Sequence, residues 1–307
     1  MSLLAMPINA AVLEALASGP TSLAELSRAA GRPSQSTLRI RLRELAELGI
    51  LTRNRLDGFP RSLDYELTAA GRQLLQVVEL LRNWLSQCPG ESLGFGTQAA
   101  RAAINALVDA WSSTMIRALA AKPLTLTELD QLIVGINYPT LERRLGALRR
   151  LGQIKAVRSS GPGTPYTVTD WLRFSTAPLA AAARWERLNA ADELPPIGRL
   201  DIEAAFLLTL PTLELPENLS GSCRLTVETR GQGERGLAGV RVEVVAGRVT
   251  SCVTNLEGQA DAWGTGSAGA WIAAALENDR NRLELGGDCD LAAALVDGLH
   301  RTMIAIG

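Results

Sequence analysis

A segment of 13 residues occurs twice in this chain, 103 positions apart. Thr37–Gly49 aligns with Thr140–Gly152, and seven of the 13 aligned pairs are identical. After each copy, at a shift of 101, Tyr65–Thr68 aligns with Tyr166–Thr169. Self-similarity of this kind indicates that one supersecondary unit is used twice. The chain has 307 residues, which leaves room for two such units and a further domain.

The first copy of the unit is predicted to contain three helices. Ile8–Ala17 has helical spacing, and a Gly-Pro pair follows it. Ser22 with Glu25 three residues later is a capping-box pattern, which starts a second short helix. Ser34 is placed to cap a third helix, on one face of which leucines recur at helical spacing: Leu38, Leu42, Leu45 and Leu48.

Two short strands and a longer helix are expected next. The strands are Ile50–Arg53 and Leu63–Leu67, and the Asp57-Gly58 pair between them is a hairpin signal. Ala69–Trp84 is amphipathic and should form the longer helix. This order of elements predicts a winged helix-turn-helix domain in each copy.

The third helix of the first copy carries side chains suited to reading DNA. An α-helix fits the major groove, where side chains reach base edges while flanking cations neutralise phosphates. Opposite Leu38 we expect base contacts from Gln35, Ser36, Arg39 and Arg43. The hairpin should add contacts to the DNA backbone from Arg53, Arg55 and Arg61. The alternative is a solvated helix face beside a charged loop.

The second copy has a weaker pattern for DNA binding. Glu142 stands where the first copy has Arg39, and a carboxylate can accept from a cytosine amino group but repels phosphate. We expect DNA contacts from Tyr138, Arg143, Lys155 and Arg158. The alternative is a winged helix that serves mainly as a packing partner for the first.

Charge divides the chain into two parts. Residues 1–190 hold 22 Lys and Arg against 15 Asp and Glu, whereas residues 191–307 hold 9 against 17. This asymmetry indicates that the first two thirds meet a polyanion, which for a winged helix is double-stranded DNA, and that the last third has another role.

Motifs of common enzyme classes are missing from the sequence. It has no G-x-S-x-G and no G-x-x-x-x-G-K-[ST], its one histidine is His300, and its four cysteines form no C-x-x-C pair. We therefore expect no enzyme activity, no metal site and no cofactor. The alternative is a catalytic last domain that uses His300.

Membrane and secretory segments are not expected. The sequence has no run of about 18 apolar residues, and its first basic residue is Arg28, so the apolar start lacks a basic leader. We expect a cytoplasmic protein without membrane contact, whose cysteines are free thiols: Cys88, Cys223, Cys252 and Cys289.

The last third is predicted to be an α+β domain with a largely antiparallel sheet. A helix is expected at Ile202–Leu210, and Gly247 should lie in a hairpin. Further elements are expected as strands at Cys223–Val227, Val240–Val245 and Val249–Val253, and as helices at Ala268–Leu276 and Leu291–Met303.

Residues 6–190 resemble the HxlR-type winged-helix regulators, which are related to the MarR group. The resemblance rests on Ile116–Leu119 with Thr140–Gly152, and on Tyr65–Leu75. It implies DNA binding. Redox-sensing members resemble one another in an N-terminal cysteine, where this chain has Met6-Pro7. The family's usual form is a homodimer of single winged helices, so two units here imply a pseudo-dimer in one chain, with a homodimer of chains as a further state.

The end of the chain resembles sterol-carrier-protein-like domains. The resemblance rests on Leu283–Asp288 followed by Leu291–Leu295, and on Ala260–Trp263. It implies an apolar cavity for a hydrophobic small molecule, lined by Phe206, Leu210, Trp263, Trp271, Ile272 and Leu295. The alternative is an ordinary core without a ligand.

These observations predict two mainly-α winged helix-turn-helix domains, residues 1–96 and 97–191, and an α+β sterol-carrier-like domain, residues 197–307. The function expected is that of a DNA-binding transcriptional regulator, with a small apolar effector as its control. A winged-helix scaffold that binds proteins and no DNA is the alternative.

Overall fold

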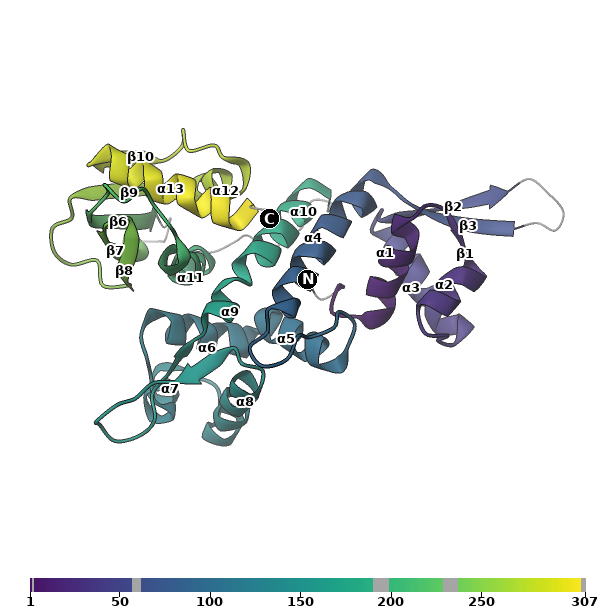
Figure 1. Cartoon of the computed structure of the whole chain (residues 1–307), viewed down its shortest axis with the longest axis horizontal. Coiled ribbons are helices and arrows are strands. Elements are labelled where there is room, and N and C mark those ends of the chain that lie inside the picture. Colours follow the sequence, from purple (N-terminus) through teal and green to yellow (C-terminus); the bar gives the residue numbers. More distant parts are fainter. Residues whose placement is uncertain (2, 57–61, 190–198, 229–236, 305–307) are drawn as a thin grey trace. The chain divides into compact units, whose positions relative to one another are not determined.

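A computed structural model describes residues 1, 3–56, 62–189, 199–228 and 237–304 of the chain (Figure 1). The chain divides into two compact units. Unit 1 comprises Met1–Asp109 and Ala181–Leu194, and unit 2 comprises Ala110–Ala180 and Pro195–Gly307.

Unit 1 is a helical domain with a small antiparallel sheet of strand order β1-β3-β2. It begins with α1 (Pro7–Ala17), β1 (Thr21–Ser22), α2 (Leu23–Ala29) and α3 (Gln35–Glu47). It continues with β2 (Leu51–Leu56), β3 (Ser62–Leu67), α4 (Ala69–Ser86) and α5 (Gln98–Val108). The predicted order of helix, helix, helix and hairpin is therefore confirmed here; the Asp57-Gly58 turn lies outside the described residues.

Local side-chain caps fix where the helices of unit 1 begin. The Ser22 hydroxyl accepts from the Glu25 backbone N–H, and the Glu25 carboxylate accepts from Ser22, as the capping-box pattern predicts. These hydrogen bonds lower the pKa of the Glu25 carboxyl. Leu48 does not continue the buried leucine face: α3 ends before it, and its side chain is 51% exposed.

Gly71 allows α4 to lie against the strand pair. A Cβ at this position would stand 2.1 Å from the carbonyl oxygen of Ile50, so no other residue fits without moving the backbone. The inner face of α4 supplies much of the core of unit 1, including Leu81, Trp84 and Leu85.

Unit 2 starts with a second run of helices and a hairpin. The elements are α6 (Ala110–Ala121), α7 (Leu126–Leu132), α8 (Tyr138–Arg150), β4 (Ile154–Ala156), β5 (Tyr166–Val168), α9 (Asp170–Arg173) and α10 (Thr176–Asn189), and α10 ends in unit 1. One hydrogen bond of this part matches a hydrogen bond of unit 1 at the equivalent position. The Thr169 hydroxyl donates to the Gly152 carbonyl (2.8 Å), and the Thr68 hydroxyl donates to the Gly49 carbonyl (2.6 Å).

The rest of unit 2 is a five-stranded sheet covered by helices. Its strand order is β10-β9-β6-β7-β8, with β6 and β9 parallel and the other neighbours antiparallel. The strands are β6 (Gly221–Glu228), β7 (Leu237–Val245), β8 (Arg248–Val253), β9 (Ala262–Ser267) and β10 (Glu284–Gly287). The helices that contact it are α11 (Arg199–Thr209), α12 (Ala268–Glu277) and α13 (Cys289–Ile304), and a short 3-10 turn, η1 (Leu210–Thr212), follows α11. Gly247 lies in the β7–β8 hairpin, as predicted.

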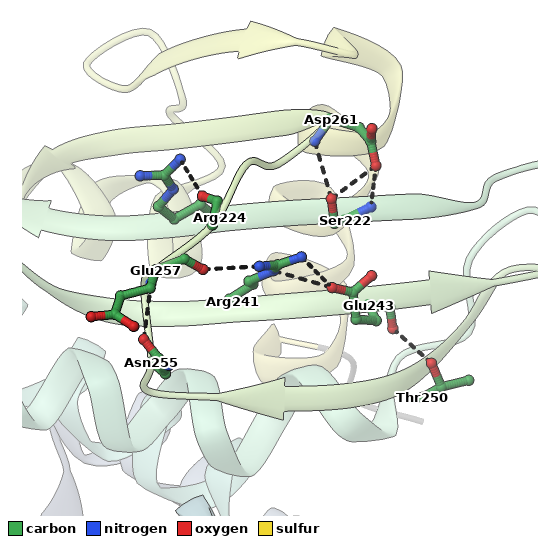
Figure 2. A network of polar contacts seen from close by, with 9 residues as sticks. Ser222, Arg224, Arg241, Glu243, Thr250, Asn255, Glu257 and Asp261 are labelled. Carbon is green, nitrogen blue, oxygen red and sulfur yellow. Dashed lines mark hydrogen bonds and ion pairs between the residues drawn. The ribbon is translucent and has the colours of Figure 1, made fainter.

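The β8–β9 connection is fastened to the sheet by a polar network (Figure 2). Arg241 Nη1 donates to the Glu257 carbonyl (2.9 Å) and its Nε donates to the Glu243 carboxylate (3.1 Å). At the end of the connection, the Asp261 carboxylate accepts from the backbone N–H of Ser222 (2.7 Å) and from its hydroxyl (2.8 Å). These contacts hold the crossover that places β9 parallel to β6.

Candidate nucleic-acid interface

Helix α3 turns one face to the core and leaves the other in solvent. The Ser34 hydroxyl caps it by accepting from the Thr37 N–H (3.1 Å). Leu38, Leu42 and Leu45 are at most 1% exposed. On the other side the residues expected to read bases are all exposed: Gln35, Ser36, Arg39 and Arg43.

Two arginines of α3 have no acidic partner among the residues that the structure describes. Arg41 forms an ion pair with Glu44 (2.6 Å), so its charge is compensated within the helix. Arg39 and Arg43 form no ion pair and no hydrogen bond with any residue that the structure describes. Exposed, uncompensated guanidinium groups are available to an external anion such as phosphate.

These arginines meet a third one in a groove of unit 1. The open groove has a volume of about 570 Å³ and lies between α3, the start of α2 and the β2–β3 pair. Arg39, Arg43 and Arg53 line it, and Leu42, Leu63 and Tyr65 contribute its apolar part. The structure therefore brings together one residue expected to contact phosphate and two expected to contact bases.

The remaining hairpin arginines are not placed. Arg53 on β2 is exposed, and its Cα pairs with that of Tyr65 on β3. The side chain of Arg55 and the whole of Arg61 lie outside the described residues. Their expected contacts with the DNA backbone remain predictions.

Helix α8 is the counterpart of α3 in unit 2. The Asn137 side chain caps it by accepting from the Thr140 N–H (2.9 Å). Tyr138 is 45% exposed, and Glu142 and Arg143 are also exposed. Lys155 on β4 and Arg158 beyond it are exposed as well. The four residues expected to contact DNA in this copy therefore all reach solvent.

The residues expected to line an apolar cavity do not all share one face. Phe206, Leu210, Trp271, Ile272 and Leu295 are each at most 7% exposed, and the rings of Phe206 and Trp271 pack edge to face with centroids 4.8 Å apart. Trp263 is 40% exposed. The buried side of β9 consists of Ala262, Gly264 and Gly266, because Trp271 and neighbouring leucines occupy the space beside them. The expectation that Trp263 lines this interior is therefore corrected.

His300 has a hydrogen-bond partner within the protein, and the pKa values of three of the four cysteine thiols are raised. His300 Nδ1 lies 3.0 Å from the Ala275 carbonyl oxygen, to which the Nδ1–H tautomer donates. Burial raises the pKa of the Cys223 and Cys252 thiols to about 12, and burial also raises that of Cys88. In the described part of the chain no group of three or more His, Cys, Asp and Glu side chains is arranged to hold a metal ion. Nor does any described helix have the length and apolarity that crossing a membrane requires.

Helix α11 makes contacts with other helices that the sequence did not predict. Helix α11 packs against the sheet and also against α6 and α9. The Glu203 carboxylate lies 3.8 Å from Arg117 of α6, and Arg173 of α9 donates to the Leu207 carbonyl. Burial lowers the pKa of the Arg173 guanidinium. The charged residues in these otherwise apolar helices were the available signal, but their partners lie 34 to 86 residues away in sequence.

Comparison with known proteins gives matches for one part of the chain. Residues 8–92 match the model of the HxlR-like helix-turn-helix family. No curated protein matches. Among solved structures, diamide-treated YodB from B. subtilis is 31% identical over 28% of this chain and 85% of its own, with a TM-score of 0.26. The reduced form of the same protein, named a transcriptional regulator, is 29% identical over 26% and 78%, with a TM-score of 0.25. The oxidised form of the redox regulator HypR is 28% identical over 25% and 78%, with a TM-score of 0.24.

Proposed function

We propose that this chain, whose residues 8–92 match the model of the HxlR-like helix-turn-helix family, is a transcriptional regulator that binds specific sequences of double-stranded DNA. The observation that carries this proposal is the groove of unit 1, in which Arg39, Arg43 and Arg53 meet without acidic partners among the described residues. A helix with exposed cations beside a basic strand pair has the form of a reader of the major groove.

In the proposed complex α3 enters the major groove. Arg39 and Arg43 donate to base edges, for which guanine is the preferred partner of arginine, and Gln35 and Ser36 reach the neighbouring bases. Arg53, together with Arg55 and Arg61, contacts the phosphates of the strand that runs along the groove. Leu63, a half-buried residue of the same groove of unit 1, packs against the sugars.

We further propose that α6–β5 is a second winged helix and that the two units act as a pseudo-dimer. The matched contacts support this: Thr68 and Thr169 bond to equivalent glycine carbonyls, and Ser34 and Asn137 cap equivalent helices. Tyr138, Arg143, Lys155 and Arg158 then contact a second half-site. Dimeric readers meet half-sites about 34 Å apart, and different reading helices favour different half-sites.

The C-terminal part, residues 197–307, is proposed to control DNA binding. Its helix α11 contacts α6 and α9, so a change in the α+β part can reach the second winged helix. An apolar effector would have to separate packed side chains such as Phe206 and Trp271, whose rings pack edge to face. Such a ligand can shift the equilibrium between two conformations of the winged-helix pair only if it binds one conformation more tightly than the other.

The test is binding to a pool of genomic duplex fragments at several salt concentrations. We compare the full chain with an Arg39→Ala/Arg43→Ala variant and with Arg41→Ala, a matched control whose arginine is already paired with Glu44. The proposal expects enrichment of one sequence class, loss of this enrichment in the double variant and little change in the control. Absence of binding by the wild type at low salt would overturn the proposal and favour a protein-binding scaffold.

A further inference from the structure

We infer that Arg39 and Glu142 make the two half-sites of the DNA different, with guanine read at one and cytosine at the equivalent position of the other. This inference deepens the proposed function and rests on it. Its basis is the pair of helices α3 and α8, which have the same length and a side-chain cap at the same position but opposite charge at one exposed position.

The caps define the register of the two helices. The Ser34 hydroxyl accepts from the N–H three residues later, and the Asn137 side chain does the same. Arg39 and Glu142 each stand five residues after their cap. They therefore occupy the same place along and around their helices.

The buried residues show that both side chains point away from the protein. Leu38 and Leu42 beside Arg39, and Leu141 and Leu145 beside Glu142, are at most 5% exposed. Behind α8, Arg144 Nη1 lies 3.4 Å from the Ser112 hydroxyl of α6. With its inner face held in this way, α8 presents Glu142 on its solvent face.

Glu142 has no role within the part of the protein that the structure describes. It is exposed, and it forms no ion pair or hydrogen bond with any residue that the structure describes. Other carboxylates nearby in sequence have structural partners: Glu128 caps α7, where hydrogen bonds from Thr125 lower its pKa. A free carboxylate in the middle of a DNA-reading face repels phosphate and weakens DNA binding, unless a hydrogen-bond donor of a base lies opposite the carboxylate.

The chemistry of the two groups determines which base each one selects. A guanidinium only donates, and its fork matches the O6 and N7 acceptors of guanine. A carboxylate only accepts, and in the major groove cytosine presents an amino donor. Opposite guanine O6 the Glu142 carboxylate would face another acceptor, so it excludes guanine as well as preferring cytosine.

The test is selection of bound duplexes from a pool with randomised half-sites, using the full chain. We compare the wild type with Glu142→Arg and Glu142→Gln, both at an exposed position where the fold should be retained. Asp130→Arg on α7, also exposed and without a hydrogen-bond or ion-pair partner among the described residues, is the matched control for added positive charge.

The wild type should select cytosine at the position that Glu142 faces and guanine at the equivalent position of the other half-site. Glu142→Arg should change the selected cytosine to guanine, with a shift in preference of about tenfold or more. Glu142→Gln should lose the preference for cytosine. Asp130→Arg should raise affinity without changing the selected sequence.

Two results would overturn the inference while leaving the proposed function intact. One is a second half-site that Glu142→Arg leaves unchanged; the other is a single enriched half-site that depends on Arg39 alone. If the wild type enriches no sequence at all, the proposed function itself fails.

Discussion

The indole Nε1 of Trp185 donates a hydrogen bond to the carbonyl oxygen of Ala70, 2.7 Å away and 115 residues earlier in the chain. It joins the end of α10 to the first turn of α4 within unit 1. Asn189 Nδ2 adds a contact to Gln73 Oε1 (3.1 Å), and Glu186 lies 3.5 Å from the N-terminal amine. Helix α10, which begins in unit 2, therefore completes the packing of unit 1.

Trp185→Phe should destabilise unit 1 modestly. The substitution keeps an aromatic ring but removes the donor, and a single hydrogen bond contributes about 1 kcal/mol to the free energy of unfolding. Urea unfolding followed by circular dichroism measures the change. Trp263→Phe is the matched control, since the ring of Trp263 is 40% exposed and has no hydrogen bond to a described residue. An equal effect of both substitutions would contradict a structural role of the Trp185–Ala70 contact.

Arg53→Ala should weaken DNA binding and make the affinity less dependent on salt concentration. If Arg53 contacts one phosphate, its loss removes one released counterion, so the slope of log affinity against log salt should fall by about 0.9. The selected sequence should stay the same, because phosphate contacts carry no base information. Fluorescence anisotropy over a salt series measures the slope. A changed sequence preference would instead place Arg53 at a base edge.

The helix-turn-helix elements could be predicted from sequence because their signals are local. Ser22 with Glu25 and the leucine spacing of α3 act within one or two turns, and the structure shows both. Helix α5 (Gln98–Val108) was not predicted, although Thr97 caps it by accepting from the Ala100 N–H (3.2 Å). The cap was visible in the sequence but was not joined to a helical pattern.

In the C-terminal part, local sequence patterns do not predict which side of a strand is buried. The alternation of residues predicted no strand at β9 (Ala262–Ser267), because its buried side carries glycines at positions 264 and 266 instead of large apolar residues. Gly264 is buried since the rings and methyl groups of Trp271, Leu225 and Leu285 lie within 3.5 Å of where its Cβ would be. Such packing depends on residues from three other elements, and period-two alternation alone does not reveal it.

Arg173→Ala should loosen α11 from α9 within unit 2. Arg173 is half-buried and donates to the Leu207 carbonyl, so its removal takes away a charged hydrogen bond that contributes about 2 kcal/mol. We expect a lower thermal midpoint and faster amide hydrogen exchange in Arg199–Thr209. Arg184→Ala on the exposed side of α10 is the comparison. Unchanged exchange in α11 would show that Arg173 does not fasten this helix.

Asp261→Asn should lower stability near neutral pH and less so in acid. Hydrogen bonds from the Ser222 backbone and hydroxyl lower the pKa of the Asp261 carboxyl below its unfolded value. The stabilisation is therefore present above the unfolded pKa of about 3.9 and is lost as pH falls through the folded pKa. Thermal melts of both proteins from about pH 7 to about pH 2 should show a difference in midpoint that narrows below about pH 4, where the carboxyl becomes protonated. A difference independent of pH would mean that the Asp261 charge contributes nothing.

The four cysteines should react with iodoacetamide at very different rates in the folded protein. Only the thiolate reacts, and burial raises the pKa of Cys223 and Cys252 to about 12, so near pH 8 about one molecule in 10,000 has either thiol ionised. Cys289 is exposed and should be alkylated first, and Cys88, whose pKa is raised by burial and by Glu91, should follow more slowly. Mass spectrometry of timed samples measures each site, and in urea all four rates should become similar. The helices proposed to read DNA, α3 and α8, contain no cysteine, so diamide should leave DNA affinity unchanged. Rapid labelling of Cys252, or a diamide-dependent loss of DNA binding, would show instead that the α9–β8 region opens and that a buried thiol takes part in control.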